Sequence, residues 1–344
     1  MSANLRRRLI ALAIIAALAI IASVIVGRRR SRDSGAVDGA ATPATFRVAI
    51  VLPGPHDDHE WSQAGYEGLQ LIQKELGATV AYSENVPSAG FDEAASGYAA
   101  KGFTLVIGHG AEYAEHAEAV AQRFPRTKFA LVALHPGNNR NLGALRFREG
   151  EIGFLTGAVA GLRTKTKKIA YIAGMKFRHL EEQAALFERG AKAIDPTIEF
   201  AAEWLGSWTD VEKARGAARG LIERGFDVLS INADKAGLSG IDEARRAGVY
   251  AIGWNLDQHD VAPATVVTSG VQRMPVVLLE GARLVRQGRW EGKQYKFGLR
   301  EGAQDLAPFH GLLAREAAAT VSRLREDILS GKLDVSYSEG PAPP

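Results

Sequence analysis

Residues 46–76 read FRVAIVLPGPHDDHEWSQAGYEGLQLIQKEL. The first seven residues form an apolar run rich in branched side chains, which is typical of a buried strand, and a polar turn with Pro and Gly follows. From Trp61 onward, apolar residues recur every three to four positions, which predicts a helix over 61–76. The stretch is therefore one strand followed by one helix, the repeating unit of proteins with parallel sheets.

This alternation continues along the chain and then starts again. Amphipathic stretches separate the next apolar runs, which are TVAYSE (79–84), TLVIG (104–108) and KFALVAL (128–134). A second series begins with KIAYIAG at 168–174 and ends with ATVVTS at 264–269. The two series predict an α/β protein with two doubly wound parallel-sheet lobes. A helix near 275–286, a strand near 295–299 and a helix near 312–329 complete the expected order.

We expect lobe 1 to comprise residues 46–145 and 272–295, lobe 2 residues 146–271 and 296–332, and a tail residues 333–344. The chain would then pass three times between the lobes, first near Leu142–Arg148, ahead of a helix over Glu151–Arg163. Open α/β sheets bind ligands at the carboxyl ends of their strands. The sequence therefore predicts a ligand cleft lined by the strand-to-helix turns of both lobes.

The first 30 residues form a leader that meets a membrane. Leu9–Val26 is apolar apart from one serine and would span about 27 Å as a helix. The run is long for a signal peptide and Arg28–Arg30 follow it directly, which favours an uncleaved anchor; the basic start and Ala-rich sites leave a cleaved signal open. Residues 31–45 are small and polar, as in a flexible tether. Either alternative predicts an exported, extracytoplasmic body.

Composition excludes several classes of function. The chain has 344 residues and no cysteine, so it has no disulfide, no cysteine nucleophile, no cysteine-based metal site and no lipid attached to cysteine. Its net charge of +3 comes from the leader, since residues 34–344 hold 35 basic and 38 acidic side chains. This balance argues against nucleic acid as a partner. Hydrolase, P-loop and dinucleotide motifs are absent, so we expect neither an enzyme nor a cofactor.

The turn after the first strand carries the strongest candidate ligand residue, Trp61. Its indole offers a flat surface on which an aromatic ligand can stack. The alternative is a structural tryptophan on the apolar face of the helix, with Leu69 and Ile72. Asp58 lies in the same turn and could also cap the helix. The nearby His56–His59 run resembles a metal cluster, but its side chains are contiguous in sequence, and we predict no metal site.

Other turns at strand ends supply further candidates for ligand binding. Each has a structural alternative, namely a plain turn, a core aromatic, a helix cap or a local Asx turn. The candidates are His109 between two glycines, the aromatic residues Phe177 and Trp208, and the polar residues Asp234, Asn255 and Asp257. Carboxylates and amides at these positions suit hydrogen bonding to the edge of a heterocycle.

Four segments resemble the basic membrane protein family of bacterial solute-binding proteins, which includes the purine nucleoside receptors of ABC transporters. DHEWSQAGYEG (58–68) is similar to the family's D-x-x-[FW]-N-x-x-x-x-x-G. The others occur in the family's order and are EGEIGFLTGAVAGLRTKTKKIAYIAG (149–174), WLGSWTDVEKARGAARGLIERGFDVL (204–229) and GVYAIGWNLDQHDVAPATVVTSGV (248–271). The resemblance covers about residues 46–332.

The resemblance implies a type I periplasmic-binding-protein fold that closes on a purine, with Trp61 stacked on the base and Asp58 as its acidic neighbour. Ser62 stands where the family often has Asn. An Asp and a Lys that contact the nucleoside in relatives correspond to Asn255 and Gln272, so a free nucleobase fits as well as a nucleoside. Asp234 matches an acidic position of the family's tryptophan-containing branch.

Together these features predict an extracytoplasmic solute-binding protein that captures a purine-type ligand and delivers it to ABC permease subunits. The leader, through residues 9–26, would join it to the membrane in place of the lipidated cysteine of many relatives. A membrane-anchored ligand-sensing module that signals to a partner protein remains the alternative, because the same two-lobed fold serves both roles.

Overall fold

The computed structural model describes residues 45–337, and the predicted leader and most of the tether lie outside this range. The described residues from Phe46 onward belong to one compact unit. Within the described range, none of the helices combines the length and the apolar character that crossing a bilayer requires.

The first sheet defines lobe 1 and contains six parallel strands in the order β11-β5-β4-β3-β1-β2. Its strands are β1 (Arg47–Val51), β2 (Thr79–Ser83), β3 (Leu105–Gly108), β4 (Lys128–Leu131), β5 (Leu142–Phe147) and β11 (Gln294–Phe297). Its helices are α2 (Trp61–Leu76), α3 (Phe91–Ala100), α4 (Ala114–Arg123) and α9 (Met274–Arg286).

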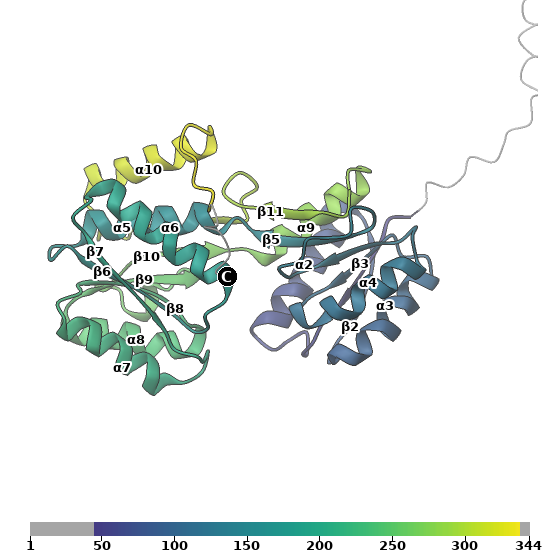
Figure 1. The fold of residues 1–344 in the computed structure, drawn as a ribbon, viewed down its shortest axis with the longest axis horizontal. Helices are drawn as coiled ribbons and strands as arrows, with labels where there is room; N and C mark the ends of the chain where they lie inside the picture. Colours follow the sequence, from purple (N-terminus) through teal and green to yellow (C-terminus); the bar gives the residue numbers. More distant parts are fainter. Residues whose placement is uncertain (1–44, 338–344) are drawn as a thin grey trace, which may run out of the picture. The chain divides into compact units, whose positions relative to one another are not determined.

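Alternate residues of β1 explain how two layers of helices cover this sheet (Figure 1). Val48 and Ile50 share a buried cluster with α2 and α9, whereas Ala49 and Val51 share another with α3 and α4. Successive strand residues point to opposite faces, so a continuous apolar run fits a strand that is buried on both sides.

The second sheet defines lobe 2 and has the order β12-β10-β9-β8-β6-β7, with only β12 antiparallel to its neighbour. Its strands are β6 (Lys168–Ala173), β7 (Glu199–Trp204), β8 (Val228–Asn232), β9 (Tyr250–Asn255), β10 (Val266–Gln272) and β12 (Gln304–Leu306). Its helices are α5 (Glu149–Arg163), α6 (Arg178–Ile194), α7 (Val211–Glu223), α8 (Asp234–Ala247) and α10 (Arg315–Leu329).

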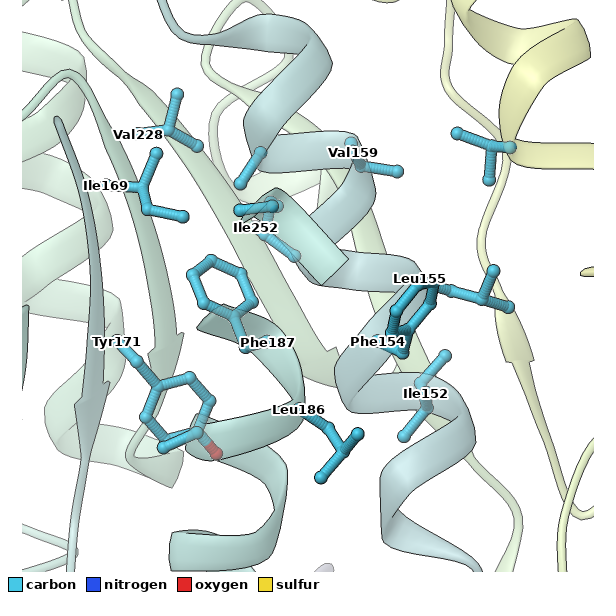
Figure 2. Packing of buried hydrophobic residues seen from close by; sticks show 14 of the residues in the cluster. Ile152, Phe154, Leu155, Val159, Ile169, Tyr171, Leu186, Phe187, Val228 and Ile252 are labelled. Atoms are coloured by element: carbon cyan, nitrogen blue, oxygen red, sulfur yellow. The ribbon is translucent and has the colours of Figure 1, made fainter. Parts of the chain in front are cut away.

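Helices α5 and α6 pack backbone to backbone because glycines stand at their contact. A Cβ at Gly157 would lie 1.9 Å from the Phe187 carbonyl oxygen, and a Cβ at Gly190 would lie 2.0 Å from that of Phe154. The side chains of Phe154 and Phe187 fill the neighbouring space, as Figure 2 shows, and Phe187 also meets Tyr171 of β6. This close packing fixes α5, the first element of lobe 2, on its sheet.

Three short segments join the lobes, and the first differs from the prediction. Leu142–Phe147 was expected to be a crossing but forms β5, which pairs with β4 and β11, so Arg148 alone joins β5 to α5. Arg273 joins β10 to α9, and residues 298–303 join β11 to β12. Strand β11 also carries lobe 1 to Phe297, two residues beyond the expected boundary.

Candidate functional site

Trp61 is the first residue of α2, and its side chain is 43% exposed. Its indole stacks on the ring of His109, with centroids 4.2 Å apart and planes 16° apart. Two hydrogen bonds lock this pair, because Trp61 Nε1 donates to the His109 carbonyl at 2.9 Å and His109 Nε2 donates to the Trp61 carbonyl at 2.8 Å. One face of the indole is therefore supported by protein, in a fixed orientation.

His109 itself is fully buried, so its ring lies beneath the indole and not on the surface. Its Nε2 carries the proton that the Trp61 carbonyl accepts, and its Nδ1 finds no hydrogen-bond partner among residues 45–337. Burial lowers the pKa of His109 to about 4, so the ring is neutral at physiological pH. The ring fits because a Cβ at Gly65 would lie 2.6 Å from its Cδ2. The buried His109 ring therefore supports the indole of Trp61.

Asp58 and Ser62 shape the turn ahead of Trp61. The Asp58 carboxylate accepts hydrogen bonds from the backbone N–H groups of Glu60, Ser62 and Gln63 at 2.8–3.0 Å, as an acid capping a helix does. Burial acts to raise the pKa of Asp58, but these hydrogen bonds outweigh it and hold the pKa below its ordinary value. Ser62 is buried, and its Oγ accepts from the N–H of Gly54. Both residues thus hold the turn in shape.

Two aromatic residues of lobe 2 lie near each other after β6 and β7. The Phe177 side chain is 45% exposed, and its ring centroid lies 6.4 Å from that of Trp208. Trp208 is half-buried against Gly174, where a Cβ would come within 2.2 Å of the indole. The glycine therefore lets the indole lie flat on the end of β6, beside an exposed phenyl ring.

Asp234 and Asn255 meet at the carboxyl ends of β8 and β9. Asn255 Nδ2 donates to Asp234 Oδ1 at 3.2 Å. Both residues have positive φ angles, 42° and 70°, a region that Asn and Asp enter more readily than most residues. Loss of solvent around the carboxyl, and then the negative charge of Glu60, raise the pKa of Asp234. The pair presents one carboxylate and one amide together.

An ion pair that no local sequence pattern predicts joins the turns of the two lobes. Lys235 Nζ lies 2.6 Å from Glu60 Oε1. Glu60 precedes Trp61, and Lys235 follows Asp234. Trp61 of lobe 1 and Asp234 of lobe 2 are thereby brought to the same region, although no local pattern links them.

Both oxygens of Asp257 have protein partners, one local in sequence and one distant. Oδ1 accepts from the backbone N–H of His259 at 3.1 Å, and Oδ2 lies 2.9 Å from His310 Nε2. The His310 ring stacks on that of His259 with centroids 3.7 Å apart. This arrangement matches the local-turn alternative for Asp257.

The site therefore combines an oriented, exposed indole in one lobe with a carboxylate–amide pair in the other, tied together across the lobes. Residues 45–338 match the family described as ABC transporter substrate-binding protein PnrA-like. The chain belongs to this PnrA-like family. A purine-binding protein of Brucella abortus is 26% identical over 286 residues, which cover 80% of this chain and 81% of that protein.

The chain is also similar to another curated protein and to a solved structure. The transcriptional activator protein med of Bacillus subtilis is 27% identical over 279 residues, covering 81% of this chain and 87% of that protein. The crystal structure of a solute-binding protein of an ABC transporter system from Aeropyrum pernix superposes with a TM-score of 0.65 at 19% identity, over 84% of this chain and 92% of that chain. The PnrA-like chain thus has the fold of periplasmic binding proteins.

Proposed function

We propose that this chain is the extracytoplasmic solute-binding protein of an ABC transporter and that it binds a purine, as nucleobase or nucleoside, between its lobes. Membership of the PnrA-like family supports the transport role. The purine-binding relative supports the ligand class. Delivery to permease subunits follows from this role, and the leader would keep the protein at the membrane.

One observation carries the ligand assignment: the exposed indole of Trp61 is held rigidly by His109. Two hydrogen bonds and a stacked ring fix the indole before a ligand arrives. A preoriented aromatic surface binds a flat heterocycle without losing side-chain freedom at that moment. Stacking of a base on an aromatic side chain contributes about 1–3 kcal/mol. Phe177 is an exposed aromatic residue of lobe 2, and we assign it as a second contact for the base.

The polar edge of the purine is assigned to Asp234 and Asn255. A carboxylate accepts hydrogen bonds from ring or exocyclic N–H groups, and the amide can both donate and accept. The family resemblance implies that Asn255 takes the place of an acid that contacts the nucleoside, so we expect fewer ribose contacts. The pair therefore suits recognition of the base more than of the sugar.

Binding would close the two lobes about the three crossings, since a ligand that touches both lobes stabilises the arrangement in which they meet. The Glu60–Lys235 pair lies beside the proposed contacts from each lobe. Closure would present to the permease a surface that differs from the open form.

The test is calorimetric titration of the full-length chain with adenine, hypoxanthine, adenosine and guanosine, with glucose as a negative control. We expect at least one purine to bind, and Trp61→Ala to weaken that binding about 5- to 150-fold, the equivalent of lost stacking. Trp61→Phe keeps an aromatic face and should retain most of the affinity. Tyr337→Ala removes another exposed aromatic and serves as the control. Absence of binding by all four purines would overturn the ligand assignment.

A further inference from the structure

Two cations lie side by side on the sheet of lobe 1, next to the crossings. Arg146 of β5 and Lys296 of β11 are direct partners in the parallel pairing of these strands. Side chains of directly paired residues lie on the same face of a sheet, where two like charges destabilise each other. Both strands end one residue later, at Phe147 and Phe297, immediately before two of the three crossings. Lobe 1 alone therefore places two positive charges together at its boundary with lobe 2.

The carboxylate that faces both cations comes from lobe 2. It belongs to Glu182 of α6, and each of its oxygens faces one cation. Arg146 Nη2 lies 3.8 Å from Oε2, and Lys296 Nζ lies 3.9 Å from Oε1. Among residues 45–337, neither cation forms an ion pair with any other acid. One acid of lobe 2 thus compensates two charges of lobe 1.

Burial strengthens this compensation across the lobes. The side chains of Arg146 and Glu182 are only 9% and 10% exposed, whereas that of Lys296 is 39% exposed. Solvent and salt screen buried charges less than exposed ones. Removing one partner of a buried pair leaves the other charge without compensation in a place where water cannot fully replace it. The contact of α6 with lobe 1 therefore depends on the charge of Glu182.

Two other titratable groups near Arg146 do not take over this role. Burial, and then the charge of Arg146, lowers the pKa of His179 to about 4, so this ring is neutral at physiological pH. Burial raises the pKa of Glu149 to about 7, so its carboxyl carries only part of a charge at neutral pH. Neither group forms an ion pair with Arg146, which leaves Glu182 as its partner across the lobes.

The distances show that the three charged groups can come closer together. Charge-assisted hydrogen bonds between nitrogen and oxygen are about 2.7–2.9 Å long, so both gaps exceed this length by about 1 Å. Arg146 Nη2 is buried and has no hydrogen-bond partner among residues 45–337. A small rotation of lobe 2 toward lobe 1 would bring Glu182 into hydrogen-bond contact. The opposite rotation would leave the two cations facing each other without their carboxylate.

We propose that Glu182 is an ionic tie between the lobes, which favours the arrangement in which they meet. In that arrangement Glu182 attracts Arg146 and Lys296 and offsets their mutual repulsion. Glu60 and Lys235 join the lobes beside the proposed ligand contacts, whereas Glu182 joins them beside the crossings. Withdrawal of α6 from β5 and β11 loses both attractions at once, so the charge of Glu182 shifts the equilibrium toward closure.

The tie bears on ligand capture, and this step rests on the proposed function. When closure encloses the ligand, the apparent affinity falls with the fraction of protein that is able to close. Glu182 is then a positioning residue that contributes to affinity without touching the ligand. The tie itself is tested without any ligand, so its failure and that of the purine assignment are distinguishable.

The experiment measures the distance between the lobes in the ligand-free, full-length protein. The chain has no native cysteine, so cysteines at the exposed positions Leu134 and Leu256 can carry a fluorescent donor and acceptor. These positions follow β4 of lobe 1 and β9 of lobe 2, so separation of the lobes lengthens the distance between them. We expect Glu182→Gln to lower the ratio of closed to open molecules about 3- to 100-fold, the range of coupling between neighbouring charged residues.

The matched control is Glu188→Gln, the same exchange on the same helix. Glu188 pairs with Lys192 of α6 itself, so its loss should leave the distance between the lobes unchanged. Lys296→Gln should also favour the open form, because it removes an attraction across the lobes, whereas Lys296→Arg keeps the charge and should behave like the wild type. This pair of variants, at a more exposed position, decides the matter if Glu182→Gln does not fold.

The double variant separates an ionic tie from a general loss of stability. Glu182→Gln should have a smaller effect when Lys296→Gln is already present, since one of the two attractions is then gone. An unchanged distance in Glu182→Gln, an equal shift in Glu188→Gln, additive effects in the double variant or equal behaviour of Lys296→Gln and Lys296→Arg would overturn the proposal.

Discussion

Glu60 of lobe 1 and Lys235 of lobe 2 form an ion pair, with 2.6 Å between carboxylate oxygen and ammonium nitrogen. Each residue is the immediate neighbour of a proposed ligand contact, Trp61 and Asp234 respectively. The pair raises the pKa of Lys235, and burial, followed by the negative charge of Glu60, raises the pKa of Asp234. Its charges thus connect the two halves of the proposed site and influence the acid that would meet the ligand.

Replacing Lys235 with Gln should weaken purine binding modestly, by less than about fivefold, since both side chains are largely exposed and such pairs contribute little. The loss should shrink further at 0.5 M salt, because screening already weakens the wild-type pair. Calorimetric titration at low and high salt measures both effects. The exchange Glu60→Lys with Lys235→Glu should recover affinity, and a double variant weaker than both single variants would contradict this role.

Gly65→Ala should disturb the proposed site through His109. The new Cβ would lie 2.6 Å from the buried His109 ring, which must shift and carry Trp61 with it. We expect a loss of about 1–3 kcal/mol in the free energy of unfolding and weaker purine binding. Chemical denaturation and titration check the two effects. Gly216→Ala lies in α7 with nothing within 4 Å and should stabilise slightly. Equal behaviour of the two variants would contradict the packing argument.

His109 should make the protein less stable in acid. Burial lowers its pKa to about 4 in the folded chain, whereas the unfolded chain binds the proton near pH 6.5. The unfolded state therefore binds more protons between these values, so the free energy of unfolding falls as pH falls from about 6.5 toward 4. His109→Phe keeps a flat ring and should reduce this slope in denaturation curves. His116→Phe is the control; a wild-type slope in His109→Phe would exclude His109 as its source.

The local pattern of apolar residues predicts most helices and strands correctly. It fails where a strand pairs with a segment that is distant in sequence. Helix α2 spans the predicted residues, 61–76, because its periodicity and its end at Gly77 are encoded within the segment. The sequence predicts a crossing where strand β5 forms, since β5 contains Gly143 and Arg146 and gains its edge partner β11 only from the far end of the chain. Strand β12 has three residues, too few to give a pattern.

In the candidate site, too, the sequence predicts local features but not the contacts between residues that are distant in sequence. The sequence predicts an exposed Trp61 and also a Trp61 on the face of Leu69 and Ile72; the structure gives it an exposed side chain at the start of α2, with the His109 ring beneath it. The burial of His109 depends on the absence of a side chain at Gly65, which a single sequence does not reveal. The Glu60–Lys235 pair depends on how the lobes meet, for which neither turn carries a local signal.

Asp234→Asn gives the sharpest test of the polar half of the proposed site. Replacing the carboxylate with an amide removes an acceptor for purine N–H groups while keeping the shape of the side chain, so affinity should fall about 10- to 150-fold. The loss of affinity should be largest for purines with the most N–H donors toward Asp234. Titrations of both proteins with adenine and with hypoxanthine compare this loss between the two bases.

The matched control for this change is Asp257→Asn, because both oxygens of Asp257 already have partners in His259 and His310. We expect this variant to retain purine affinity within about threefold, since the exchange alters local hydrogen bonds of modest net value. Circular dichroism would confirm that both variants fold. If Asp257→Asn lost as much affinity as Asp234→Asn, the base edge would have to be reassigned toward the loop after β9, because only a shared ligand contact would make the two carboxylates equivalent.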